Sequence, residues 1–285
     1  MLVESAESLA RGAGAIVRRA YGQVSQVETK GVVDLVTETD RAAEAHIVAA
    51  LRHRFPDHSI WAEESGRDAA DADVRWIIDP LDGTTNFAHR LPHFAVLIAV
   101  QARRNDRYET LAGVCYDPLR DECFVAEAGG GMRLNGVVTT VSTTTRLIDA
   151  ALATGFAYDR LHTLDDNHRE FCRLNLVSRG VRRFGSAGLD FAYVACGRFD
   201  GFWERGLQPW DMAAGMLLVE EAGGRVTAYD GSPARLEEGR VVASNGPLHA
   251  PLCAALAAAT RYPTNSRQDL ADHLPAEIAA KVVTS

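Results

Sequence analysis

The sequence predicts an α/β protein whose sheets are covered by helices. Short apolar runs of strand length, such as residues 76–78 and 94–101, share the chain with longer segments whose apolar residues recur at helical spacing. Beyond about residue 150 the two kinds of segment alternate. This alternation is typical of sheets with helices packed on their faces. The 285 residues suit one large domain or two closely packed parts.

The N-terminal segments predict two helices around a short irregular stretch. Residues 3–21 carry apolar side chains at helical spacing, and residues 40–55 form a second amphipathic pattern. Thr37 or Thr39 is the expected N-cap of the second helix, and Pro56 ends it. Residues 27–39, which are polar and β-branched, predict a loop or a short hairpin. The apolar run at 76–78 is a buried strand.

The middle of the chain predicts a strand, a hairpin and a boundary. Residues 94–101 form a nearly continuous apolar strand, and residues 113–116 and 122–126 flank a hairpin turn. Three glycines at 129–131 predict a turn, because no helix pattern follows them. The polar repeat at 139–145 marks a boundary between an N-terminal part (1–143) and a C-terminal part (144–265). The role of the tail, 266–285, is not readable.

The C-terminal part predicts alternating strands and helices. The expected strands are residues 151–154, 200–204, 225–227 and 241–244. The expected helices are residues 165–179, 187–196, 211–222 and 247–260. Pro209 near the start of the third helix and Gly223 after its end support its bounds.

Composition excludes several classes of protein. The formal net charge of −8 argues against a general nucleic-acid binder, which needs a basic face. The odd number of cysteines, five without a CxxC pair, predicts reduced thiols in the cytoplasm. No apolar run has membrane-spanning length, and the acidic N-terminus is unlike a signal peptide. We therefore expect no membrane partner and no direct nucleic-acid binding.

The segment 76–87 carries the strongest chemical signal. The apolar run ends in Asp79-Pro80-Leu81-Asp82-Gly83, where Pro80 and Gly83 predict a tight turn that stops the strand. Two carboxylates so close together repel each other, and a divalent cation such as Mg²⁺ removes that repulsion. Backbone N–H groups at the start of the following helix could hold phosphate.

Four further segments extend this motif. They are Lys30–Asp40, Trp61-Ala62-Glu63-Glu64-Ser65-Gly66, Pro209-Trp210-Asp211-Met212-Ala213-Ala214-Gly215, and Val219-Glu220-Glu221-Ala222-Gly223-Gly224. Together with DPLDGTTNF they resemble the inositol monophosphatase family of Mg²⁺-dependent phosphomonoesterases, over about residues 30–224. The resemblance implies an αβαβα sandwich of the sugar-phosphatase type, a homodimer and sensitivity to lithium. Ala62 departs from the glycine frequent there, which matters only if that backbone needs a positive φ.

The resemblance implies a site for two or three Mg²⁺ ions. Glu63, Asp79 and the Leu81 carbonyl would hold the first ion. Asp79, Asp82 and Asp211 would hold the second, so that Asp79 bridges the two. A third, weakly held ion would lie near the loop that contains Lys30 and Asp34.

The resemblance also implies how water and phosphate are positioned. Glu63 and Thr84 would orient the attacking water. Asp40 would accept the proton of the Thr84 hydroxyl and so raise the basicity of that hydroxyl toward the water. The backbone N–H groups of Gly83 and Thr84 would hold the phosphate.

Substrate recognition is assigned to the C-terminal part. By resemblance, Glu204 binds a hydroxyl of the substrate, and Gly185, Ser186 and Ala187 line the same pocket. Two arginines beside them, Arg182 and Arg183, would form a subunit contact or a charge at the rim.

Other residues near the motifs are predicted to be structural. Glu64 follows Glu63 and is expected to make a salt bridge or hydrogen bond. Trp210 would pack at the start of the helix that carries Asp211. The remaining ones are expected at helix starts or on solvated faces: Thr85, Asn86, Glu220 and Glu221.

The predicted function is Mg²⁺-dependent hydrolysis of a phosphate monoester of a polyol, with myo-inositol monophosphate favoured. The dipeptide Thr85-Asn86 favours the inositol branch of the family. Phosphatases of histidinol phosphate, fructose 1,6-bisphosphate or adenosine bisphosphate remain alternatives. Because some bacterial members of the family act on transcription machinery, an additional protein-binding role also stays open.

Overall fold

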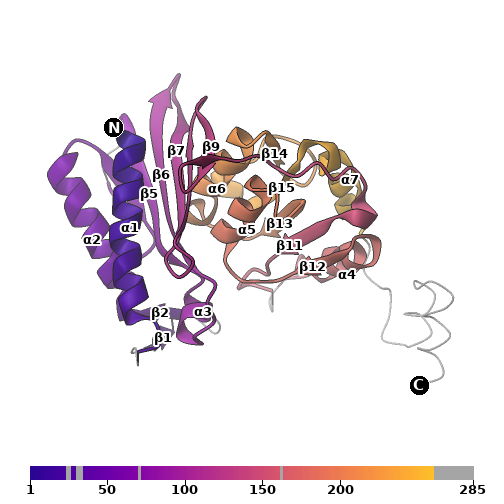
Figure 1. Ribbon diagram of the computed structural model, residues 1–285, viewed down its shortest axis with the longest axis horizontal. Helices are drawn as coiled ribbons and strands as arrows, with labels where there is room; N and C mark the ends of the chain where they lie inside the picture. The colour runs from indigo at the N-terminus through magenta and orange to yellow at the C-terminus, as the bar shows by residue number, and fades with distance from the viewer. Residues whose placement is uncertain (24–26, 30–34, 70–71, 161–162, 260–285) are drawn as a thin grey trace.

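The chain folds into five alternating layers of helices and sheets (Figure 1). This computed structural model describes residues 1–23, 27–29, 35–69, 72–160 and 163–259. Two helices cover the first sheet, two more lie between the sheets, and two cover the far side of the second sheet. The predicted αβαβα sandwich is confirmed. Lys30, Asp34 and the tail 266–285 lie outside the described residues.

The first layer contains α1 (Leu2–Ala20) and α2 (Glu38–Arg54), as predicted. Between them, residues 27–39 include a short hairpin of β1 (Val27–Thr29) and β2 (Leu35–Thr37). Of the two possible caps of α2, the structure uses Thr37, whose hydroxyl accepts a hydrogen bond from the Thr39 N–H at 3.2 Å.

The first sheet has eight strands in the order β10-β9-β8-β7-β6-β5-β3-β4. Only β3 and β5 pair in parallel. The strands are β3 (Ser59–Ala62), β4 (Gly66–Arg67), β5 (Val74–Asp82), β6 (Ala95–Arg104), β7 (Arg107–Asp117), β8 (Glu122–Glu127), β9 (Gly131–Leu134) and β10 (Val137–Val138). The predicted hairpin is β7 and β8. The short strands β3, β4, β9 and β10 were not predicted, because two to four residues carry no recognisable period.

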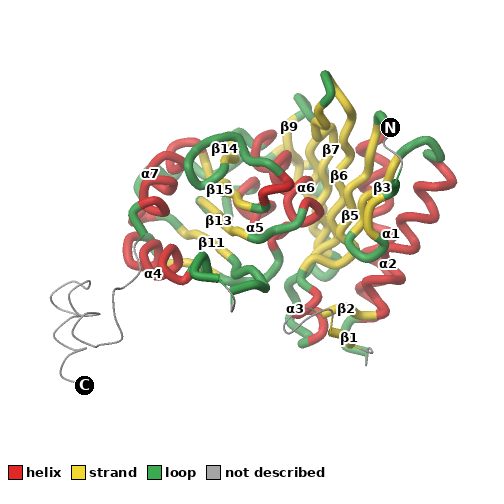
Figure 2. The backbone as a smooth tube through the Cα atoms, turned by 180° about the vertical axis from the view of Figure 1, so that it is seen from behind, coloured by secondary structure: helices red, strands yellow, loops and turns green. Residues whose placement is uncertain are grey.

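The second sheet has five strands in the order β12-β11-β13-β15-β14, and helices lie on both of its faces (Figure 2). The strands are β11 (Ala151–Thr154), β12 (Gly180–Arg182), β13 (Gly201–Arg205), β14 (Gly224–Thr227) and β15 (Arg240–Asn245). The inner helices are α5 (Ala187–Ala195) and α6 (Pro209–Glu221), and the outer ones are α4 (His168–Val177) and α7 (Gly246–Ala257). A short helix, α3 (Thr84–Ala88), follows β5.

Two predicted details of this part differ from the structure. The helix expected from residue 165 begins only at His168, because Asn167 has a left-handed backbone conformation, with φ 66°. Strand β12 was not predicted, since it has only three residues. The other helices and strands of this C-terminal part lie within two or three residues of their predicted bounds.

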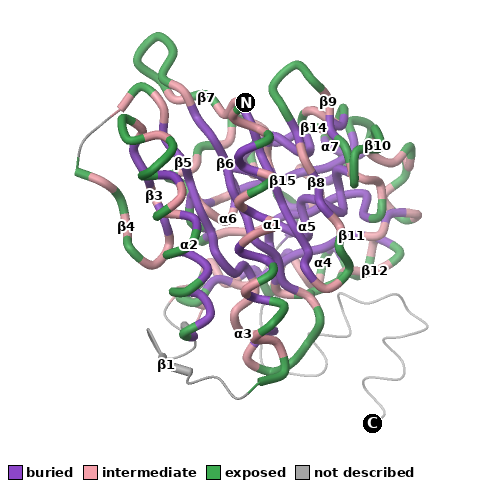
Figure 3. The backbone as a smooth tube through the Cα atoms, turned by 60° about the vertical axis from the view of Figure 1, so that its left-hand side comes forward, coloured by how far each residue is buried: buried purple, intermediate pink, exposed green. Residues whose placement is uncertain are grey.

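Strand β5 is buried on both faces, as Figure 3 shows for the centre of the first sheet. Trp76 and Ile78 belong to the core beneath α1 and α2, whereas Ile77 packs with Ala213 and Ala214 of α6. A strand covered on both sides reads as a continuous apolar run. The polar C-terminal end of this strand is therefore attached to a rigid core.

Within the described part of the chain, no helix is long and apolar enough to cross a membrane. The boundary predicted at 143/144 falls in the connection between β10 and β11, which joins the two sheets. As a division into domains it stays a prediction.

Helix α6 approaches the first sheet closely because Gly113 on β7 has no side chain. A Cβ at residue 113 would lie 2.7 Å from the Ala214 carbonyl oxygen and 3.1 Å from its Cα. On the other side of α6, a Cβ at Gly215 would meet the Phe191 ring of α5 at 2.5 Å. These two contacts hold α6, which carries Asp211, against both neighbours.

We predict that Gly113→Ala destabilises the fold. The methyl group would collide with helix backbone, which cannot rotate away, so the free energy of unfolding should fall by about 1–3 kcal/mol. Urea denaturation measures this change. The control is Gly246→Ala, where a Cβ meets no atom within 4 Å. Equal stability of both variants would show that α6 is not held by this contact.

Candidate active site

The two aspartates of the central motif lie at the end of β5, but the predicted tight turn between them is wrong. Strand pairing continues to Asp82. On β5 the register advances from Asp79 to Asp82, whereas on β6 it moves only from Leu97 to Ala95. The extra residue on β5 forms a bulge, where Pro80 is tolerated. The bulge places both carboxylates at one end of the sheet without ending the strand.

Asp79 is the most strongly perturbed carboxyl group of the motif. Its side chain is 2% exposed, and its Oδ1 accepts a hydrogen bond from the Leu81 N–H at 2.9 Å. Burial raises the pKa of Asp79 well above its usual value. Three neighbouring carboxylates raise it further, namely Glu63, Asp82 and Asp211. Four acidic residues from three segments of the chain thus lie near enough for their charges to interact.

Asp82 connects β5 to the start of α5. Its carboxylate accepts hydrogen bonds from the Ser186 hydroxyl at 2.6 Å and from the N–H groups of Ala187 at 3.2 Å and Gly188 at 2.8 Å. Burial raises the pKa of Asp82 to about 6, although these hydrogen bonds oppose the increase. Ser186 and Ala187, predicted to line the substrate pocket, therefore contact Asp82. Gly188 was not predicted.

Asp211 is held at the first turn of α6. Its Oδ2 accepts a hydrogen bond from the Gln208 N–H at 2.7 Å, in a capping box that ends the preceding loop. Burial, followed by the charge of Asp82, raises the pKa of Asp211 well above its usual value. The helix start thus fixes the position of this carboxylate.

Asp40 and Thr84 are in direct contact. The Thr84 hydroxyl lies 2.9 Å from Asp40 Oδ1 and 3.1 Å from the Leu81 carbonyl oxygen, and it can donate to either. The other oxygen of Asp40 accepts from the Thr37 N–H at 2.9 Å and from the Thr37 hydroxyl at 2.5 Å. Burial raises the pKa of Asp40 against these hydrogen bonds. The pair predicted to relay a proton is therefore assembled.

Glu63 follows β3, and its backbone N–H donates to the Ile78 carbonyl at 3.1 Å. The next two N–H groups, of Glu64 and Ser65, each donate to the carboxylate of Glu44 at 2.8 Å. Glu44 lies on the buried face of α2 and was not predicted. A carboxylate at helical spacing from the apolar residues of that face was the signal for it. Ala62, for its part, has no positive φ, so its departure from the family pattern is harmless.

The loop around Gly83 contacts the C-terminal part. Gly83 has φ 97°, and a Cβ there would lie 3.1 Å from the His93 carbonyl and 3.2 Å from the Gly185 carbonyl. The Asn86 amide donates to the carbonyls of His93 at 2.7 Å and Phe184 at 2.8 Å. Asn86 thus does more than support a helix start, because it joins α3 to the loop before α5.

Glu204 lies at the end of β13, half-buried. Burial raises the pKa of Glu204 to about 8, opposed by the nearby guanidinium of Arg183 and reinforced by Asp82. Asp190 of α5, also near Glu204, is 1% exposed, and burial raises its pKa well above its usual value. Its Oδ1 has no hydrogen-bond partner among the described residues. Asp190 was not predicted, although it is the one acidic residue of an otherwise apolar helix.

The residues predicted to be structural have packing or bonding roles. Trp210 contacts Trp61 edge to face, with ring centroids 6.4 Å apart. Glu221 accepts hydrogen bonds from the N–H groups of Gly129 and Gly131, each at 2.8 Å, and so holds the glycine turn. Arg182 and Arg183 are exposed, and their role as a subunit contact stays a prediction.

The donor set has the chemistry of a magnesium site. It offers carboxylate oxygens and one backbone carbonyl, which are the ligands that Mg²⁺ prefers. In the described residues, no three acidic, histidine or cysteine side chains converge closely enough to enclose an ion as they stand. The assignment of particular ligands to particular ions therefore stays a prediction.

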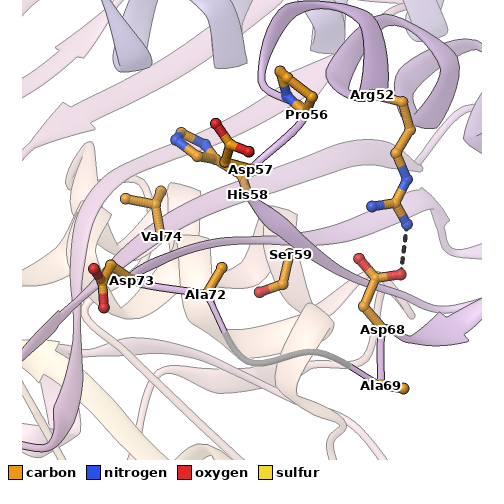
Figure 4. A pocket seen from close by; sticks show the side chains of 10 residues that line it. All are labelled: Arg52, Pro56, Asp57, His58, Ser59, Asp68, Ala69, Ala72, Asp73 and Val74. Carbon is orange, nitrogen blue, oxygen red and sulfur yellow. Dashed lines mark hydrogen bonds and ion pairs between the residues drawn. The ribbon is translucent and has the colours of Figure 1, made fainter.

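A separate cavity of about 740 Å³ lies between the end of α2 and the starts of β3 and β5 (Figure 4). Three of the side chains that line it are acidic, namely Asp57, Asp68 and Asp73, and Arg52 pairs with Asp68 at 2.5 Å. Such a lining disfavours a phosphate ester. None of the predicted site residues lines this cavity.

Known proteins resemble this chain over most of its length. Residues 2–261 match the inositol monophosphatase family. An inositol-1-monophosphatase of Synechocystis is 49% identical over 262 residues, covering 91% of this chain and 90% of its own. The Nus factor SuhB of Pseudomonas aeruginosa is 47% identical over 243 residues, covering 83% of this chain and 88% of its own.

A solved structure extends the likeness to three dimensions. An inositol monophosphatase from Anabaena superimposes with a TM-score of 0.82 and 44% identity, covering 91% of this chain and 96% of that one. The layered fold agrees with this result. The chain belongs to the inositol monophosphatase family.

Proposed function

We propose that this protein hydrolyses a phosphate monoester of a polyol, with myo-inositol monophosphate as the favoured substrate. The observation that carries the proposal is the pair of buried aspartates at the end of β5, Asp79 and Asp82, with Glu63 and Asp211 near enough for their charges to act on Asp79. Such a cluster is costly without cations, and with them it can bind a phosphate group. Family membership and the Synechocystis inositol-1-monophosphatase support the same reaction.

We propose that two or three Mg²⁺ ions bind at this cluster. Glu63, Asp79 and the Leu81 carbonyl would hold one, and Asp79, Asp82 and Asp211 another. Bound Mg²⁺ supplies activation of a water molecule and neutralisation of the charge on the phosphoryl oxygens. The position proposed for a third ion, near Asp34, lies outside the described residues.

The protein's own groups position the reactants. Because the Thr84 hydroxyl can donate to Asp40, its oxygen is free to accept a proton from the attacking water, which Glu63 helps to orient. Thr37 holds Asp40 in place with two hydrogen bonds. We assign the phosphate to the backbone N–H groups of Gly83 and Thr84 at the start of α3.

Recognition of the alcohol would fall to the C-terminal part. We propose that Glu204 accepts a hydrogen bond from a substrate hydroxyl and that Gly185 borders the same pocket. Ser186 and Ala187 reach this pocket as well, but their hydrogen bonds to Asp82 indicate that they also orient a metal ligand. A panel of phosphate esters separates polyol monophosphates from the alternatives, which are histidinol phosphate, fructose 1,6-bisphosphate and adenosine bisphosphate.

The Pseudomonas Nus factor SuhB, at 47% identity, favours a second candidate role in transcription through protein contacts. Retrieval of defined transcription proteins by the tagged chain would support it. Phosphate release in a purified assay is independent of that role.

We further propose a cytoplasmic homodimer. All five cysteines are free, which suits a reducing compartment. The dimer follows from family membership alone, and light scattering at micromolar concentration would refute it by giving the mass of one chain.

We predict that Mg²⁺ both activates and stabilises the protein. A cation that binds only the folded state increases the free energy of unfolding by about 2.7 kcal/mol when its concentration is a hundred times its Kd. Tm rises accordingly. Excess EDTA should abolish phosphate release and lower Tm, and lithium should inhibit. Asp79→Asn should lose the Mg²⁺-induced shift in Tm, whereas Asp73→Asn, in the separate acidic cavity, should keep it. Full activity in EDTA would contradict the mechanism.

We predict that Glu204→Ala raises KM for myo-inositol 1-phosphate about tenfold or more. The variant leaves a substrate hydroxyl without its hydrogen-bond partner in both ground and transition states, which costs about 1–3 kcal/mol. Steady-state kinetics measure the effect. A loss confined to kcat would instead assign Glu204 to the metal cluster.

A further inference from the structure

Gly155 lies directly beside Glu204 on the neighbouring strand. Strands β11 and β13 run parallel, and their last paired residues are Thr154 and Trp203. Gly155 directly follows the last residue of β11, and Glu204 is the next residue of β13. A Cβ at residue 155 would lie 2.0 Å from Oε1 of Glu204 and 2.2 Å from both Cδ and Oε2. The carboxylate of Glu204 therefore occupies the space that a side chain at residue 155 would need.

Backbone conformation gives no reason for a glycine at this position. Gly155 is absent from the residues with positive φ, so an alanine could adopt its φ and ψ. The requirement for glycine is therefore set by the Glu204 carboxyl group, which supplies all three of the atoms nearest to that Cβ.

The backbone around Gly155 is fixed by a closed set of hydrogen bonds. The Asn167 amide donates to the Gly155 carbonyl at 2.6 Å and to the Thr154 hydroxyl at 2.8 Å. The Trp203 indole donates to the Asn167 carbonyl oxygen at 2.7 Å, and the Thr154 hydroxyl donates to the Trp203 carbonyl at 2.5 Å. Asn167 is 2% exposed. The ends of both strands are thus tied together behind Glu204.

We propose that Gly155 is a specificity-determining position. Because it has no side chain, the Glu204 carboxylate can lie against the end of β11, where it can accept a hydrogen bond from a hydroxyl of the substrate. The inference rests on the proposed function, in which Glu204 contacts the substrate. Gly155 acts through Glu204 and is a positioning residue. Asn167 supports it by preventing the backbone of β11 from moving away.

A methyl group added at residue 155 can be accommodated if the Glu204 side chain moves. The backbone is held by Asn167, whereas the carboxylate is the end of a flexible side chain. In Gly155→Ala we therefore expect the Glu204 carboxylate to swing away while the fold is kept. Recognition of the alcohol should suffer, and the acidic cluster at the end of β5 should remain.

A double-mutant cycle tests this coupling. Kinetics in saturating Mg²⁺ are measured for the wild type, Gly155→Ala, Glu204→Ala and the double variant, with myo-inositol 1-phosphate and with p-nitrophenyl phosphate, which lacks polyol hydroxyls. Gly155→Ala should raise KM for the inositol ester about tenfold relative to KM for the aryl ester, with kcat changed less than about threefold. In the Glu204→Ala background, Gly155→Ala should change KM by less than about twofold.

The outcomes separate the inference from the function on which it rests. Independent, multiplying effects of the two substitutions on KM would overturn the inference. An unchanged KM in Glu204→Ala would instead overturn the proposed role of Glu204. If Gly155→Ala alone does not fold, the double variant should fold, since the collision is gone, and an unfolded double variant would also overturn the inference. Gly246→Ala serves as the glycine control, because open space surrounds its Cβ.

Discussion

The hydrogen bonds between Asp82 and the start of α5 are the interaction on which the site depends. Asp82 ends the central strand of the first sheet, and Ser186, Ala187 and Gly188 begin a helix of the middle layer. A carboxylate at a helix N-terminus is favoured by the unpaired N–H groups and by the helix dipole. The same contact therefore joins the two halves of the chain and fixes the direction of a proposed metal ligand.

Three aspartates of the site, two from the acidic cluster and Asp40 beside it, are each held by hydrogen bonds at the start of a helix. Asp82 uses α5, Asp211 uses the first turn of α6, and Asp40 uses Thr37 at the start of α2. In each case a helix start provides N–H groups that would otherwise lack partners. These bonds hold the carboxylates in place although burial raises the pKa of all three. The N-terminal ends of three helices thus position carboxylates of the site, while the apolar faces of the same helices pack in the core.

Sequence patterns identified the parts of the site that are local along the chain. The apolar run before Asp79 predicted a buried strand, and the proline near the start of α6 predicted where that helix begins, since period and turn chemistry act over a few residues. The bulge at Pro80 was read as a turn because proline and glycine signal both. Glu44 and Gly155 were missed for a different reason. Their roles depend on partners that only the folded chain brings near them, 20 residues away for Glu44 and across two strands for Gly155.

The residues proposed to bind the phosphate and those proposed to recognise the alcohol belong to different sheets. The acidic cluster collects at the end of β5 in the first sheet, whereas Glu204, Gly155 and the Asn167 hydrogen bonds belong to the second. Asp82 and α5 connect them. The hydrogen bonds at the ends of β11 and β13 join Thr154, Gly155, Asn167 and Trp203, whereas Glu204 and Asp82 influence each other through charge. This arrangement gives a physical reason why one reaction centre can accept different alcohols. On the proposed function, the residues beside Glu204, and not the acidic motif that first identifies the family, would determine the choice of substrate.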